Sequence, residues 1–392
     1  MPLLTTRPQS RPVALDPHHR EQRPAGPCPP TPRGPLSATV LSALRQPPGS
    51  LGPTPHVGPI DALVDDDLQL ASYVCYELHY RGFAGVDAEW EWDPALLAFR
   101  VRLERAFVKG LTAEVGPSQN RGDVGGALVE LIEAASGPSL STFLAKSGTL
   151  AQLEEFCIHR SAYQLKEADP HTFAIPRLTG DAKAAMVEIQ NDEYGSGRAE
   201  DMHSALFALT MGALGLDSTY GAYLDRLPAP TLATVNLVSM FGLHRRWRGA
   251  LVGHLAVFEM TSVEPMRRYA HALTRLGVGS EGRRFYNVHV TADVRHAAIA
   301  LDQLVAGVVA AEPELGNDLL FGAAAVLLVE ERFARHLLNA FTTGRSSLIP
   351  PPIDLSRGDP RLRSIPRASP ADPWPIVGLR ARTATTDGDP AA

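Results

Sequence analysis

The stretch FYNVHVTADVRHAA, residues 285–298, decides what kind of fold this chain of 392 residues can have. It places His289, Asp293 and His296 at intervals of four and three, which brings the three side chains onto one face of an α-helix. Apolar residues surround them, so this face is not plainly solvated. Because buried imidazoles and carboxylates are costly unless they are paired or bind a cation, the stretch predicts either an ordinary His–Asp hydrogen bond or part of a metal site.

The central part of the chain, about residues 61–345, is predicted to be all-α and is long enough to bury a substantial core. Strand signals are scarce, and no repeat of fixed period is evident. Asp93-Pro94 is a typical helix start. Besides the stretch above, helical spacing of apolar residues covers 61–83, 93–111, 140–170 in two pieces broken near Gly148, 180–195, 199–216, 229–277 in two or three pieces, and 318–341.

Both ends of the chain are rich in proline. Of the 33 prolines, 15 lie in residues 1–60 and 9 in residues 350–392. Such segments cannot keep a regular backbone ladder and carry little apolar mass. The sequence therefore predicts four parts, which are a disordered tail (1–60), a helical extension (61–149), a main helical domain (150–345) and a second disordered tail (346–392).

Charge and composition disfavour several classes of protein. The net charge is −6, and the densest basic run, HRRWRG at 244–249, is more typical of a solvated helix face than of a nucleic-acid site. The three cysteines have unrelated spacings and form no zinc or disulfide pattern, which favours a reducing cytoplasm. The N-terminal residues lack a hydrophobic signal core, and the longest apolar run, 319–329, is too short to span a bilayer. We therefore expect a cytoplasmic protein that binds neither membrane nor nucleic acid.

Acids and histidines embedded in apolar sequence extend the set begun by the opening stretch. Taken singly, Glu167 is typical of a surface acid near a helix end, and Glu193 of the last residue of a helix. His203 is typical of a satisfied core histidine. Glu259, deep in an apolar run, fits an ordinary role least well. Together with the opening stretch they make seven candidate ligands from at least five predicted helical segments: Glu167, Glu193, His203, Glu259, His289, Asp293 and His296.

This donor set suits a particular kind of metal chemistry. Carboxylates are hard oxygen donors that can bridge two cations, and imidazoles suit iron, copper and zinc. Several glutamates and a nearby histidine in a helical bundle are the familiar composition of a di-iron or di-manganese carboxylate centre. Seven ligands shared by two metals leave coordination positions open. A structural zinc site would be closed, four-coordinate and usually rich in thiolates, which does not match.

The sequence resembles the haem-oxygenase-like di-iron oxidases and oxygenases, known as iron-containing redox enzymes. Their pattern is a Glu, then a DEYG-type segment followed by His, then Glu, then His-x-x-x-Asp-x-x-His. Here these are Glu167, Glu193 in NDEYGSG (191–197), His203, Glu259, and HVTADVRH (289–296). No ligand position is missing, and the resemblance covers about residues 150–345.

The resemblance implies a haem-oxygenase-like helical bundle that binds no haem. It implies a labile centre of two Fe(II)/Fe(III) ions with O2 as co-substrate, in which the seven residues are metal ligands and no further residue is assigned as catalytic. Members oxygenate amino acid or guanidine nitrogens or cleave C–C bonds of fatty or amino acids, often in specialised metabolism. One bridging carboxylate is expected, Glu193 or Asp293. The mode of reaction, the small-molecule substrate and the division of ligands between the irons stay open, and relatives are commonly homodimers.

Two other functions remain as alternatives. One is a metal-independent enzyme of cofactor biosynthesis with the same fold, which seven ligands in order disfavour. The other is a non-catalytic metal-binding helical protein, which would need no organised substrate pocket. Near the candidate ligands in sequence lie Arg177, Arg198 and Arg267, but none can be assigned as a clamp for a substrate carboxylate.

Overall fold

The computed structural model describes residues 26–58, 60–117 and 122–351, and within these ranges the chain is helical without a β-strand. The all-α prediction is therefore confirmed. The α-helices follow in the order α1 (Pro35–Ala43), α2 (Asp66–Glu77), α3 (Pro94–Val115), α4 (Val124–Ala134), α5 (Leu140–Lys146), α6 (Leu150–Gln164), α7 (Asp169–Thr172), α8 (Gly180–Glu193), α9 (His203–Ala213), α10 (Ala229–Leu243), α11 (Arg248–Thr261), α12 (Val263–Arg275), α13 (Arg284–Ile299), α14 (Ala306–Ala311) and α15 (Gly316–Thr342).

Several helix boundaries have the local cause that the sequence indicates. The Asp93 side chain accepts a hydrogen bond from the backbone N–H of Leu96 at 2.8 Å, and Pro94 opens α3. At the predicted break near Gly148, α5 ends, and Thr149 and Gln152 form a reciprocal capping box that starts α6. The α4 helix was not among the predicted segments; its sequence, VGGALVELIEA (124–134), has two glycines in its first turn, and glycine has a low helix propensity.

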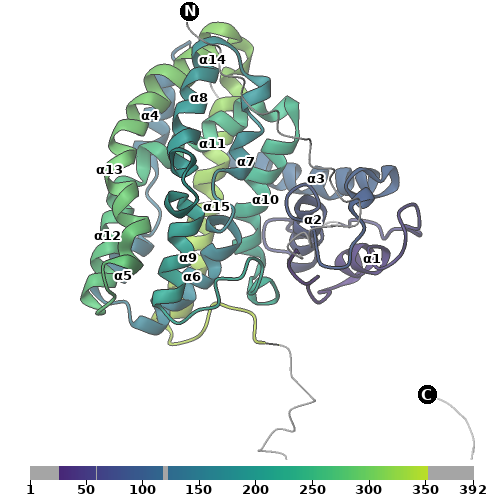
Figure 1. Ribbon diagram of the computed structural model, residues 1–392. Helices are drawn as coiled ribbons and strands as arrows, with labels where there is room; N and C mark the ends of the chain where they lie inside the picture. The colour runs from purple at the N-terminus through teal and green to yellow at the C-terminus, as the bar shows by residue number, and fades with distance from the viewer. Residues whose placement is uncertain (1–25, 59, 118–121, 352–392) are drawn as a thin grey trace, which may run out of the picture. The chain divides into compact units, whose positions relative to one another are not determined.

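The α11 and α15 helices form the centre of the bundle and cross in close contact (Figure 1). At the crossing, a Cβ atom on Gly253 would collide with the carbonyl oxygen of Leu319, and one on Gly322 with that of Ala250. Only glycine allows two helix backbones to approach this closely. The α13 helix packs on α9, α11 and α12. This packing fixes the height of Glu259, near the end of α11, relative to the acid and imidazoles of α13.

Parts of both predicted disordered tails are packed against the fold. Within residues 26–58, the α1 helix buries Val40 and Leu41 in the main core, so the prediction of disorder is wrong for this range. Its short apolar pattern, LSATVLSAL (36–44), lies among prolines that conceal it. At the other end Ser347 is buried and its hydroxyl contacts His159 and Glu155. The rest of the predicted tails, 1–25 and 352–392, lies outside the described residues.

One helical run in the described part of the chain, Glu281–Ala311, is long and apolar enough to cross a membrane by length and composition alone. About a third of its most apolar window, 33%, is buried inside the fold. Core helices pass the same test, and this run carries His289, Asp293 and His296 on a buried face. Its middle, Ala300–Val305, is a π-helical turn.

Candidate metal centre

The structure brings all seven candidate residues to one place between α8, α9, α11 and α13. Glu259 comes from α11, and α13 supplies His289, Asp293 and His296 on successive turns of one buried face. Glu193 is the last residue of α8, and His203 is the first of α9. Glu167 differs from the prediction, because it lies in the turn between α6 and α7 rather than on a helix.

The link between α8 and α9 is a tight turn that depends on glycine. Gly195 has φ +62°, and Ser196 and Gly197 also have positive φ values. A Cβ atom on Gly195 would collide with the backbone of Asp201 and Met202. The turn therefore ends α8 at Glu193 and starts α9 at His203, so that both side chains enter the same space.

Four residues form a first group of donors. The candidate ligand atoms of Glu167, Glu193, His203 and His289 all lie within 4.8 Å of one another. Nδ1 of His203 is 2.8 Å from Oε2 of Glu193, and Nε2 of His289 is 3.8 Å from Oε1 of Glu167. The His203 and His289 rings are close, with centroids 4.3 Å apart. Two carboxylates and two imidazoles around one point are suitable ligands for iron.

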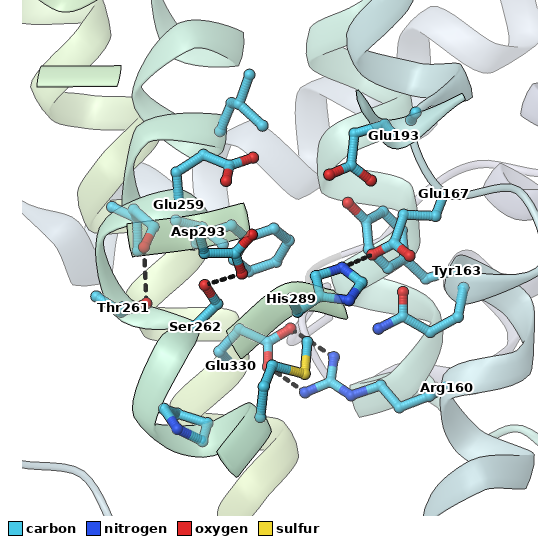
Figure 2. Close-up of a pocket in the computed structure, with 18 of the residues that line it drawn as sticks. Arg160, Tyr163, Glu167, Glu193, Glu259, Thr261, Ser262, His289, Asp293 and Glu330 are labelled. Atoms are coloured by element: carbon cyan, nitrogen blue, oxygen red, sulfur yellow. Dashed lines mark hydrogen bonds and ion pairs between the residues drawn. The ribbon is translucent and has the colours of Figure 1, made fainter. Parts of the chain in front are cut away.

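A second group shares one member with the first. Glu193, Glu259 and His296 also place donor atoms within 4.8 Å of one another. Nδ1 of His296 is 3.3 Å from Oε2 of Glu259 and 3.6 Å from Oδ1 of Asp293. Figure 2 shows the carboxylates of Glu259 and Asp293 facing those of Glu193 and Glu167 across a gap. Glu193 thus belongs to both groups of donors.

Several polar atoms of the two groups have no hydrogen bond although they are buried. Leaving a buried donor or acceptor unpaired is costly. The unpaired atoms are Oε2 of Glu167, Nδ1 of His203, Oδ1 of Asp293 and Nδ1 of His296. Three of these atoms lie within 3.6 Å of another donor of the two groups without forming a hydrogen bond to it, as expected of atoms that could bind a cation between them. The donor set therefore fits metal ions.

The pKa shifts within the cluster show that its carboxylates favour positive charge beside them. Burial would lower the pKa of both α13 histidines, but carboxylates raise it to about 10 for His289, with Glu167 foremost, and to about 11 for His296, with Asp293 and Glu259 foremost. Burial would raise the pKa of Glu193, but the imidazoles around it lower it to about 2. Burial raises the pKa of Glu259 to about 7. The protons on the imidazoles thus balance the negative charge of the carboxylates. Bound cations could balance the same charge instead.

Hydrogen bonds outside the cluster orient its imidazoles. Nδ1 of His289 donates to the backbone carbonyl of Phe285 at 2.7 Å, which leaves Nε2 for the cluster. Nε2 of His296 contacts Oδ2 of Asp192 at 3.1 Å, which leaves Nδ1. Such outer partners fix the tautomer of a metal-binding histidine. Asp192 directly precedes Glu193 in the chain.

Ser262 makes a contact with the cluster that the sequence did not reveal. Its hydroxyl donates to Oδ2 of Asp293 at 2.5 Å and so orients the other carboxylate oxygen toward the cluster. Ser262 lies between α11 and α12, where no spacing rule connects it with α13.

A cavity of about 240 Å³ opens beside the cluster. Glu167, Glu193, Glu259, His289 and Asp293 form part of its wall. The remainder is largely aromatic and aliphatic, as is usual for a site that binds a small organic molecule. Its apolar and aromatic side chains include Phe156, Tyr163, Phe207, Leu255, Val257, Phe258, Met266, Tyr269, Tyr286, Val326 and Leu327.

The cavity contains one ion pair besides the cluster. The Arg160 guanidinium donates to both oxygens of Glu330, at 2.9 and 2.6 Å (Figure 2). The arginines that lie near the ligands in sequence do not reach this cavity. Arg177 donates to backbone carbonyls at the end of α10, and Arg198 and Arg267 form exposed pairs with nearby acids. The cationic side chain of the cavity is thus Arg160, which α6 places one helical turn before Tyr163 and Gln164.

Comparison with known proteins relates the segment that carries the cluster to a described protein family. Residues 154–331 match the family described as "Iron-containing redox enzyme". A segment of 141 residues is 26% identical to a protein named nitrosourea synthase from Streptomyces achromogenes subsp. streptozoticus. The matched segment covers 36% of this chain and 30% of that protein. The chain therefore spans about a third of the length of this relative. All seven candidate ligands lie within the matched range 154–331.

Proposed function

Residues 154–331 form a domain of the iron-containing redox enzyme family, with its haem-oxygenase-like all-α fold, and on this basis we propose that the chain is a non-haem di-iron oxidase or oxygenase that activates O2. The observation that carries the proposal is the pair of donor groups that share Glu193. One group would hold the first iron through Glu167, Glu193, His203 and His289. The other would hold the second through Glu193, Glu259, Asp293 and His296.

The two irons would supply the electrons and the open coordination positions that O2 needs. The chain supplies the surroundings. Asp192, Ser262 and the carbonyl of Phe285 hold donor atoms in place. Because His289 and His296 carry protons when carboxylates alone surround them, both must release a proton before they can bind iron.

The cavity supports an organic substrate rather than simple metal storage. The apolar part of its wall offers few hydrogen-bond partners to water, and a substrate that displaced water from this space would strengthen electrostatic interactions beside the cluster. Besides the donors of the cluster, the Arg160–Glu330 pair places one positive and one negative group in a wall whose remainder is largely apolar. A purely metal-buffering protein would have no need of this arrangement, and we propose that a compact substrate occupies it.

The name of the relative favours one type of oxidation. A nitrosourea contains an N–N=O group, so the name of the Streptomyces protein denotes chemistry at nitrogen. We therefore propose N-oxygenation of an amino acid or amine ahead of oxidative C–C cleavage for this chain. The matched segment covers only 30% of that relative, so its activity as a whole is not transferred.

The test is substrate-dependent O2 consumption. The full chain is loaded with Fe(II) under anaerobic conditions, mixed with O2 and followed by stopped-flow absorbance with a panel of amino acids, amines and fatty acids. We expect two irons per chain and faster decay of the oxidised centre with nitrogen-containing substrates. Two bound irons without any substrate-dependent consumption of O2 would favour the metal-binding alternative. Equal activity without iron would favour the metal-independent enzyme.

A further inference from the structure

Glu167 is presented by a short turn rather than by a helix. The turn comprises residues 165–168, between α6 and α7. Ala168 has φ +76°, a left-handed conformation that residues other than glycine seldom adopt. Such a conformation persists only where the surrounding structure enforces it. The contacts that enforce this turn therefore decide where the Glu167 carboxylate lies.

The outer side of the turn is tied to the N-terminal helix α2. The Lys166 ammonium, next to Glu167 in the chain, donates to Oε2 of Glu77 at 3.0 Å, with 1% and 0% of the two side chains exposed. It also lies 4.1 Å from the centre of the Tyr80 ring. The Tyr220 hydroxyl donates to the same Glu77 oxygen at 2.7 Å. Glu77 is thus the common acceptor of a buried network.

A second contact, from a residue four positions after the end of α2, holds the start of the turn. The Arg81 guanidinium donates to the backbone carbonyl of Leu165 at 3.0 Å and lies 4.2 Å above the Tyr220 ring. Two consecutive residues of the turn, Leu165 and Lys166, are therefore attached to the segment 77–81.

The inner side of the turn is tied to α8, the helix that ends at Glu193. The Gln190 amide donates to the backbone carbonyl of Ala168 at 3.1 Å, and the Tyr194 hydroxyl donates to Asp169 at 2.9 Å. The turn is therefore held between α2 on one side and α8 on the other. Loss of the α2 side would leave it attached to α8 alone.

The Glu77–Lys166 pair is poorly explained by stability. Removing two charges from water costs several kcal/mol, and replacing a buried pair with apolar side chains is often neutral or stabilising. What an ion pair adds over apolar packing is a directional contact, since it fixes the Lys166 side chain to one oxygen atom. Fixing Lys166 in this way is expected to fix the position of the adjacent residue, Glu167.

We propose that Glu77 is a positioning residue of the metal centre, which acts through Lys166 to hold the Glu167 carboxylate toward His289. Glu77 lies outside the range 154–331 that matches the family, so α2 and the segment that follows it complete the site from outside the matched domain. The inference rests on the proposed function, because it takes the first donor group to be a metal site.

The test measures Mn(II) binding to the full chain by titration and electron paramagnetic resonance. Two Mn(II) ions that share Glu193 give a spin-coupled spectrum, whereas a single ion gives six lines. In E77Q we expect affinity at the Glu167 group to fall about 10- to 100-fold, as for other outer partners of metal ligands. The six-line spectrum should then appear at Mn(II) concentrations where the wild type shows the coupled one.

Two further variants separate positioning from general stability. E77Q/K166M removes both charges, so its Tm should recover from the loss in E77Q while its Mn(II) affinity stays low. D67N is the matched control, because Asp67 caps α1 through Leu36 and Ser37 and does not contact the turn. It should lower the Tm yet keep the coupled spectrum.

Two results would overturn the proposal. One is wild-type Mn(II) affinity in both E77Q and E77Q/K166M. The other is Mn(II) affinity that follows the Tm through all the variants, which would indicate a purely structural role. If the wild-type chain itself bound no Mn(II) pair, the proposed function would fail first, and the proposal with it. The wild-type titration therefore distinguishes the two failures.

Discussion

Replacing Asp192 with asparagine tests whether His296 is a metal ligand held by its outer partner. Oδ2 of Asp192 lies 3.1 Å from Nε2 of His296, while Nδ1 of the same ring faces Glu259 and Asp293. A carboxylate at this place accepts the Nε2 proton and makes Nδ1 a stronger donor to a metal. An amide can still accept the hydrogen bond, but it carries no charge.

The expected loss of metal affinity depends on how exposed the Asp192 side chain is. Outer partners of this kind affect metal affinity by about 10- to 100-fold. Because 32% of the Asp192 side chain is exposed, water screens its charge, and we expect the lower end of this range. D192N should thus weaken binding of one of the two ions about tenfold, or about 1.4 kcal/mol, without changing the affinity of the other.

The assay is competition between the protein and an Fe(II) chelator under anaerobic conditions, which gives stepwise dissociation constants. Glu188→Gln is the matched control, since Glu188 lies one turn earlier on α8 and contacts Arg295 but not His296. E188Q should retain both wild-type constants. An equal loss in both variants would mean that only the general negative potential matters, and no loss in D192N would remove His296 from the set of ligands.

Three further predictions follow from the site and its supports. E259A and H296A should each lose at least one iron by elemental analysis, and a variant that kept two irons and full O2 reactivity would refute the assignment. At pH 8 the pKa values of about 10 for His289 and 11 for His296 leave both imidazoles protonated. Metal binding should therefore release about two protons and tighten as the pH rises. Calorimetry in buffers of different ionisation enthalpy measures the protons released, and no release would contradict the prediction. G253A should lower the free energy of unfolding by about 1–3 kcal/mol in urea denaturation, because its Cβ would collide with α15, whereas G212A, in open space, should cost nothing.

The sequence was sufficient for features that depend on short-range spacing. Intervals of four and three placed His289, Asp293 and His296 on one face of a helix, and this face is buried in the structure. The predicted segments 180–195 and 199–216 already placed a break between Glu193 and His203, and Gly148 marked the break before α6. Each of these follows from a few neighbouring residues and needs no knowledge of the tertiary fold.

Features that depend on tertiary contacts could not be predicted. Glu167 sits in a turn because Glu77 and Gln190, 90 residues before it and 23 after it in sequence, hold that turn from two sides. The sharing of Glu193 between two donor groups likewise follows only from the way α8 meets α11 and α13. The α1 helix is ordered although prolines surround it, because Val40 and Leu41 are buried in the main core. Local composition does not indicate this burial.

The central claim is that two cations lie between the seven side chains and share Glu193. Crystals of the full chain grown without oxygen and soaked in Fe(II), with diffraction recorded on both sides of the iron absorption edge, test it most directly. The account predicts two anomalous peaks, one beside Glu167, His203 and His289 and the other beside Glu259, Asp293 and His296. An iron-soaked crystal with no peak in this space, or with iron bound only elsewhere, would contradict it.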